Sequence, residues 1–103
     1  MEPELSGTWY VLEGEPGEHL VVEALGRRLS GVWTTRAGAE RFLAFHPELG
    51  MRVSPLESRA LTEAFLRALG MLGVEAVLVD YQPGVHQARL AQVEELLREV
   101  RRA

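Results

Sequence analysis

Hydrophobic and polar positions alternate in the first third of the chain, where aromatic and β-branched residues form short runs. Such runs between glycine-rich turns are typical of β-strands. We expect strands at residues 7–13, 19–25 and 29–33, separated by Gly14-Glu15-Pro16-Gly17 and by Gly26-Arg27-Arg28. The second and third strands are short and joined by a tight turn, so they are predicted to pair antiparallel.

A spacing of three and four residues then predicts a helix. It starts after Thr34 or Thr35, whose hydroxyl can accept a hydrogen bond from the first turn, and it stops at Pro47. Its inward face consists of Ala39, Phe42, Leu43 and His46. A short apolar stretch at 51–53, closed by Pro55, is a fourth candidate strand.

The clearest helical pattern covers residues 57–70, and a last helix is expected at 85–101. The apolar stripe of the first of these helices is Leu61, Ala64, Phe65, Ala68, Leu69 and Leu72. The stripe of the last helix is Leu90, Val93, Leu97 and Val100. Either Gly70 or Gly73 is expected to cap the helix at 57–70.

Residues 74–81 are apolar on both faces, which indicates an interior strand that is covered on both sides. The predicted order is β-β-β-α-β-α-β-α. This is an α+β (mixed α/β) fold, a single sheet of four to five strands with three helices packed on it. The length of 103 residues suits one domain over residues 1–103, with a loose N-terminal end at 1–6.

Composition limits the chemistry that is available. The chain has no cysteine and no lysine, which excludes thiolate catalysis, thiolate metal sites and a Schiff-base lysine. Its eleven basic residues are all arginine, a bias that fits a GC-rich genome or a thermophile. The acidic start lacks an apolar signal segment, and no apolar run approaches the roughly 20 residues that span a bilayer, so we expect a cytoplasmic protein without membrane contact.

The segment after the interior strand holds the candidates for catalysis, Asp80, Tyr81 and His86. Ligands of open α/β sheets often bind beyond the carboxyl ends of the strands. Asp80 would orient His86, which would act as a general acid or base. We favour the simpler alternative, in which Asp80 ends a strand, Pro83-Gly84 makes a turn and His86 starts a surface helix.

His46, Glu48 and Arg52 form a second polar group. A histidine at the end of a helix interacts favourably with the helix dipole, and that structural role is sufficient. His19, His46 and His86 are far apart in the sequence and lack the spacing of metal ligands, so we predict no metal. No nucleotide-binding or hydrolase motif is present, and we predict no cofactor.

Trp9 and Trp33, with Arg27 and Arg28 nearby, indicate a candidate interaction surface. Strand alternation places Trp9 and Tyr10 on opposite faces, so at least one large ring faces solvent unless something covers it. Aromatic residues and arginine are enriched at the centres of interfaces. We favour the alternative that these rings belong to the core or cover the sheet.

Nucleic acid is not an expected partner, because the net charge is −4. Binding would require the arginines at 27, 28, 36 and 41 to lie on one face.

The segment Val32-Trp33-Thr34-Thr35 before a helix, and the later strand and turn from Gly73 to Pro83-Gly84, resemble the N-terminal domain of the SseB-like (enhanced serine sensitivity) family over residues 8–86. The resemblance implies a mixed α/β domain without established enzymatic activity. The same features fit a small uncharacterised family of arginine-rich thermophilic bacteria.

These observations favour a noncatalytic protein-interaction module whose partner is another protein or a second copy, in a homodimer. The alternative is a small-molecule-binding or hydrolytic site at the C-terminal end of the strand at 74–81.

Overall fold

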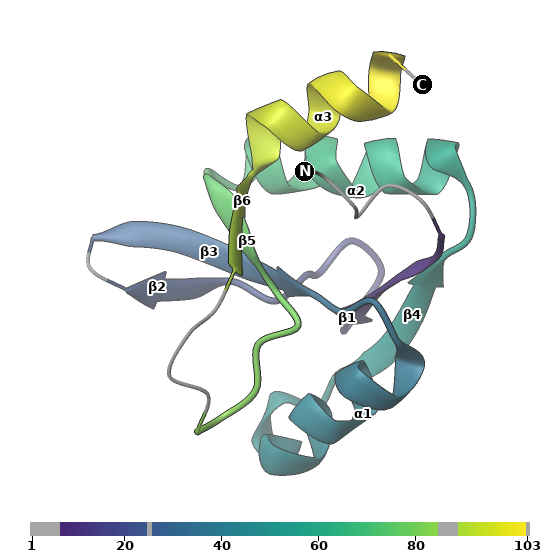
Figure 1. Cartoon of the computed structure of the whole chain (residues 1–103). Coiled ribbons are helices and arrows are strands. Elements are labelled where there is room, and N and C mark those ends of the chain that lie inside the picture. The colour runs from purple at the N-terminus through teal and green to yellow at the C-terminus, as the bar shows by residue number, and fades with distance from the viewer. Residues whose placement is uncertain (1–6, 25, 85–88, 103) are drawn as a thin grey trace.

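The structure, a computed structural model, describes residues 7–24, 26–84 and 89–102 (Figure 1). Within these residues the elements are β1 (Trp9–Glu13), β2 (Val22–Ala24), β3 (Arg27–Val32), α1 (Arg36–Phe45), the 3-10 turn η2 (Pro47–Leu49), β4 (Arg52–Leu56), α2 (Arg59–Met71), β5 (Ala76–Val79), β6 (Arg89–Gln92) and α3 (Val93–Arg102). The predicted mixed α and β class is confirmed. The single sheet is wrong, because the described strands form one sheet of two strands and one of four.

The four-stranded sheet has the order β2-β3-β5-β6. β3 pairs with β5 in parallel, and the β2–β3 and β5–β6 pairs are antiparallel. β5 therefore has a neighbour on each side, and the predicted interior strand is confirmed. The antiparallel pairing of the second and third strands is confirmed as well.

The two-stranded sheet pairs β1 with β4, and it places Pro55 opposite Tyr10. The expected end of this strand at Pro55 is wrong. β4 lies at a sheet edge, where a residue without a backbone N–H is tolerated. The backbones of Tyr10 and Trp33 connect the two sheets, since each donates to the other at 2.8 and 2.9 Å.

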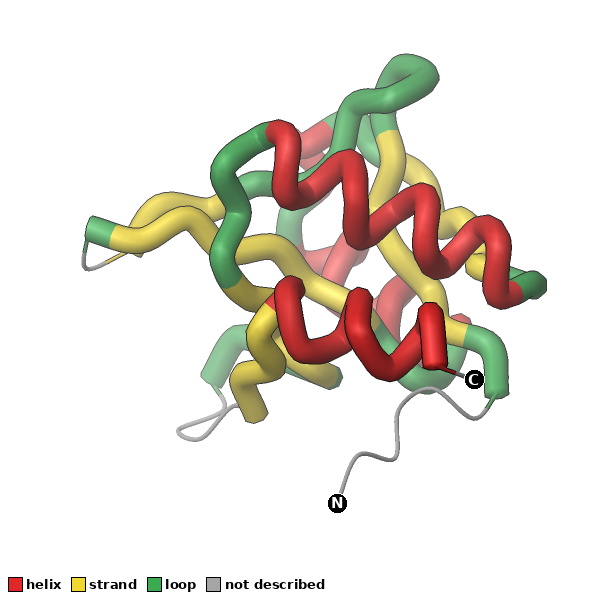
Figure 2. Tube along the Cα trace, turned by 90° about the horizontal axis from the view of Figure 1, so that it is seen from above, coloured by secondary structure: helices red, strands yellow, loops and turns green. Residues whose placement is uncertain are grey.

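The helices lie on two sides of the strands. α2 and α3 run side by side on one side, and α1 lies on the other (Figures 1 and 2). None of the helices in the described ranges is long and apolar enough to cross a membrane.

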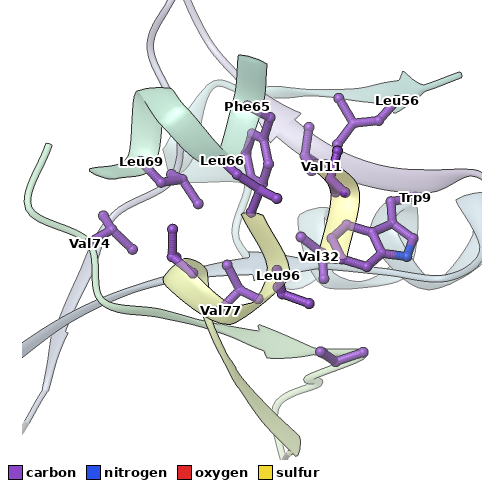
Figure 3. Packing of buried hydrophobic residues seen from close by; sticks show 13 residues of the cluster. Trp9, Val11, Val32, Leu56, Phe65, Leu66, Leu69, Val74, Val77 and Leu96 are labelled. Carbon is purple, nitrogen blue, oxygen red and sulfur yellow. The ribbon is translucent and has the colours of Figure 1, made fainter. Parts of the chain in front are cut away.

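Two groups of buried side chains fill the interior, as expected when sheets and helices each bury one apolar face. The helix-side core is Trp9, Val11, Val32, Leu56, Phe65, Leu66, Leu69, Val74, Val77, Val79, Val93, Leu96 and Val100 (Figure 3). The Trp33 cluster is Leu12, Leu20, Trp33, Ala39 and Phe42, with Tyr10, Leu43, Leu49, Met51, Val53 and Tyr81 packed against it.

Capping explains the ends of the first two helices. Thr35, one of the two predicted caps, begins α1, and its hydroxyl accepts from the Gly38 N–H at 3.0 Å. Gly73 ends α2 in a left-handed conformation with φ 79°, which glycine adopts without steric cost. The N–H of Val74 donates to the Leu69 carbonyl at 2.9 Å, which satisfies a carbonyl of the last turn.

The buried face of α2 differs from the predicted apolar stripe. Phe65, Leu66 and Leu69 are its buried residues, whereas Leu61 is 49% and Leu72 40% exposed. The apolar arc of this helix is wider than the sheet can cover. Packing selects the part of the arc that buries Leu66, and it leaves the Leu61 flank at the surface.

The predicted helix at 85–101 is wrong at residues 89–92. Residues 89–92 form β6, Leu90 is paired with Leu78, and α3 starts only at Val93. The backbone groups of an interior strand need partners on both edges, and this requirement outweighs the helical spacing of Leu90. Residues 85–88 lie outside the described ranges.

Candidate functional site

The segment after β5 is held against the β3–α1 junction by hydrogen bonds. The carboxylate of Asp80 accepts from the backbone N–H of Thr34 at 2.8 Å and from its hydroxyl at 2.9 Å. The carbonyl of Tyr81 accepts from the indole N–H of Trp33 at 2.9 Å. We call residues 80–82 the clamp segment.

Gln82 completes the clamp segment, because its side-chain amide donates to the Gly38 carbonyl at 2.8 Å. Asp80 has a φ of 59°, the left-handed region that aspartate tolerates better than most residues. The left-handed bend at Asp80 and its two bonds to Thr34 join the carboxyl ends of the parallel strands β3 and β5.

The structure describes two of the three candidate catalytic residues, Asp80 and Tyr81. His86 lies outside the described residues, so its position relative to Asp80 and Tyr81 stays a prediction. Both oxygens of Asp80 already accept hydrogen bonds, and the Tyr81 ring packs 6.2 Å from the Phe42 ring, centroid to centroid. The Asp80 carboxylate is therefore engaged with Thr34, and the Tyr81 ring packs in the Trp33 cluster.

In the second polar group, His46 and Glu48 contact each other and Arg52 does not join them. The Nδ1 of His46 lies 3.2 Å from a carboxylate oxygen of Glu48, and the His46 ring packs on Phe42 at 4.6 Å between centroids. Arg52 points elsewhere, since its guanidinium donates to the Gly14 carbonyl at 3.0 Å. The pair closes the end of α1 and is a structural feature.

A backbone hydrogen bond and the contact with His46 hold the pKa of Glu48 below its usual value. A lowered pKa means that the ionised carboxylate stabilises the folded state above the unfolded-state pKa, and this contribution is lost as the pH falls through the lowered pKa. We expect the His46→Ala variant to raise the midpoint of the Glu48 titration toward that of an unstructured peptide, as followed by carbon NMR of the carboxyl group. An unchanged Glu48 midpoint in the His46→Ala variant would contradict the pairing.

Within the described residues no three histidine, aspartate or glutamate side chains are grouped closely enough to hold a metal ion.

The two tryptophans lie in the interior. Trp9 is 3% and Trp33 1% exposed, in the helix-side core and the Trp33 cluster respectively. The favoured alternative, that these rings belong to the core, is confirmed, and the candidate interaction surface with Trp9 or Trp33 as its anchor is wrong. Helices cover both faces on which these rings lie.

The arginines beside them serve the fold as well. Arg27 pairs with Glu75 at 3.2 Å. Arg28 pairs with Glu23 at 3.1 Å, and its guanidinium also donates to the Leu72 carbonyl at the end of α2 at 2.8 Å. Of the other arginines considered for nucleic acid, Arg36 lies over the Tyr10 ring, 5.2 Å from its centroid.

Sequence reasoning missed a surface between α2 and α3. A hollow of about 580 Å³ lies there, with Leu66, Gly70, Met71, Val74, Val93 and Leu97 among its lining residues. Arg67, Glu75, Glu94 and Arg101 are charged residues of the same lining. We call this surface the α2–α3 face. The one signal in the sequence is Gly70-Met71, a glycine beside a large apolar side chain in the last turn of a helix.

Met71 is the most exposed large apolar residue in the described part of the chain, at 88%. The hollow beside it is open at Gly70, where an added Cβ would meet no atom within 4 Å. The face therefore carries both a projecting side chain and an unfilled apolar depression.

Charges on the α2–α3 face are arranged along its length. The N–H of Val93 donates to the Glu75 carbonyl at 2.9 Å, and Arg101 pairs with Glu63 at 3.2 Å. The start of α3 therefore lies beside the end of α2, and the two helices are antiparallel. Glu75 and Glu94 mark the end where α3 begins, and Arg101 marks the other.

A family model described as "Protein of unknown function (DUF3234)" matches residues 6–97 of the chain. The match supports the expectation of an uncharacterised family. It gives no support to the resemblance to the SseB-like family. No curated protein matches the sequence.

Proposed function

This chain belongs to the DUF3234 family, whose function is unknown, and we propose that it is a noncatalytic interaction module that pairs with a second copy through the α2–α3 face. The observation that carries the proposal is Met71, which is 88% exposed beside an apolar hollow of about 580 Å³. Methionine is flexible and polarisable, and it fills irregular apolar depressions well. An exposed apolar side chain of this kind next to a depression is typical of a docking surface.

Twofold symmetry favours a second copy as the partner. In a twofold dimer the same patch is used by both subunits, so it must be complementary to itself. The α2–α3 face satisfies this condition, because Met71 of each copy would enter the depression over Gly70 of the other. Alanine in place of Met71 would leave that depression empty.

Sedimentation at micromolar concentration tests this proposal. We expect the natural protein to be a dimer and Met71→Glu to weaken dimerisation at least about tenfold, because it buries a charge in an apolar depression. Gly70→Leu should weaken it too, since a Cβ at this position meets no atom of its own subunit within 4 Å and the rest of the side chain would fill the depression.

Phe45→Glu is the matched control. Phe45 is 56% exposed at the end of α1, on the other side of the molecule, so the same apolar-to-acidic change should leave the dimer intact (Figure 1). A natural protein that stays monomeric, or a dimer that Phe45→Glu breaks and Met71→Glu does not, would refute the proposal.

A further inference from the structure

A second hollow, on the flank of α2 away from α3, has the features of a small-ligand site. It lies between the N-terminal half of α2 and the β1–β4 sheet, and its volume is about 330 Å³. This volume is at the small end of the range for ligand pockets, about 300–1000 Å³. Val11, Leu56 and Phe65 give it a firm wall, because all three belong to the helix-side core (Figure 3).

Part of the lining comes from an apolar flank of α2 that the fold leaves exposed. Leu61 and Ala64 belong to the predicted apolar stripe of α2, but they are exposed and line the hollow. α2 already packs on the sheet through Phe65 and Leu66. Leu61 and Ala64 are therefore free to contact the apolar body of a ligand.

One carboxylate enters this apolar setting. The Glu13 side chain lines the hollow and is 26% exposed. The Nη2 of Arg52 forms an ion pair with it at 3.8 Å, which is too long for a hydrogen bond, and the other terminal nitrogen of this exposed arginine donates to the Gly14 carbonyl. A half-buried carboxylate with unused acceptor sites favours a cationic donor.

His19 stands next to Glu13 in the same lining. The backbones of the two residues form an isolated antiparallel bridge, and the imidazole meets the Phe65 ring edge-on, with 5.2 Å between centroids. Its Nδ1 is buried and has no hydrogen-bond partner among the described residues. The imidazole thus places polar atoms beside Glu13 while its ring extends the aromatic wall.

We propose that this hollow, the Glu13 chamber, binds a small organic amine in its ammonium form. The ammonium donates to the Glu13 carboxylate, and an apolar group of about phenyl size contacts Leu61, Ala64 and Phe65. A ligand with a carboxylate would place like charges together. A neutral ligand of the same shape would cover Glu13 without giving it a charged donor.

Three probes of matched size test the ligand class: 2-phenylethylamine, 2-phenylethanol and 3-phenylpropionate. We expect the amine to bind at millimolar concentration and to shift the backbone amide signals of Leu61, Ala64 and Phe65 in nitrogen–proton NMR spectra. The alcohol and the acid should bind at least about tenfold more weakly, the loss expected for a charge-assisted hydrogen bond.

Two variants test the location. Glu13→Gln should reduce amine binding to the level of the alcohol, and Ala64→Trp should abolish binding by filling the chamber. Glu40→Gln on α1 and Ala60→Trp on the solvent side of α2 are the matched controls, and both should bind as the natural protein does.

Binding of the amine that survives Ala64→Trp, equal binding of amine and alcohol, or no binding of the amine at millimolar concentration would each overturn the proposal. None of these results bears on the α2–α3 face, because the two hollows share no lining residue.

Discussion

Replacing Trp33 by alanine is expected to lower the free energy of unfolding by about 3–5 kcal/mol, the cost of removing a large aromatic side chain from a packed core. Trp33 is 1% exposed, and its ring lies 5.0 Å from that of Phe42, centroid to centroid. The variant also leaves the Tyr81 carbonyl without the indole N–H that donates to it at 2.9 Å. Urea titration followed by circular dichroism, at one protein concentration, measures the loss.

Two variants separate the contributions to this effect. Trp33→Phe keeps part of the apolar volume but removes the N–H, so it should cost clearly less than alanine. Gly31→Ala approaches the same ring from the sheet, because its Cβ would lie 2.9 Å from the Trp33 six-membered ring, and we expect a loss of about 1–3 kcal/mol from overpacking. A loss below about 1 kcal/mol in Trp33→Ala would show that the Trp33 cluster does not hold α1 on the sheets.

Local signals along the chain were sufficient to predict the elements whose ends depend on their own residues. Thr35 and Gly73 act through hydrogen bonds within a few residues of the helix ends, so the sequence displays both. The strand at 74–81 is another such case, because its two apolar faces already indicate cover on both sides. Here local preference and tertiary packing point to the same structure.

The misplaced elements depend on partners far away in the sequence. Leu90 has the spacing of a helix face, but its backbone is required at the edge of β5, opposite Leu78. Pro55 ends a strand in most contexts, yet β4 places it opposite Tyr10 at an edge. No pattern within a window of the sequence reveals which strand edges remain open for such pairing.

The candidate sites predicted from the sequence differ from those found in the structure for a similar reason. Asp80 and Trp33 attract attention in the sequence because they are rare polar and aromatic residues, and the structure uses them to join β5 to the β3–α1 junction. Met71 and Leu61 are ordinary residues of a helix, and their exposure becomes visible only when the direction of α2 is known. Both proposed surface sites depend on apolar residues that packing leaves exposed.

The Asp80 carboxylate is expected to be the other large contributor to stability, because it ties the ends of two parallel strands together. Asp80→Ala removes two hydrogen bonds to Thr34 and places a Cβ without a polar group in the left-handed region. We expect the free energy of unfolding to fall by about 2–3 kcal/mol, from about 1 kcal/mol for each bond at an exposed site and a share of the backbone strain. The same urea titration measures it.

Glycine at this position separates the side chain from the backbone. Asp80→Gly loses the same hydrogen bonds but relieves the strain of a φ of 59°, so it should be about 1 kcal/mol more stable than Asp80→Ala. Asp80→Asn keeps an acceptor oxygen and tolerates the left-handed conformation, and it should be the mildest of the three. In the Thr34→Val background, which lacks the hydroxyl donor, Asp80→Ala should cost less than in the natural protein, because the two residues are coupled directly. Equal losses in both backgrounds would mean that the carboxylate–hydroxyl bond contributes nothing, and the loss in Asp80→Ala would then come from the bond to the Thr34 backbone N–H and from the backbone strain at residue 80.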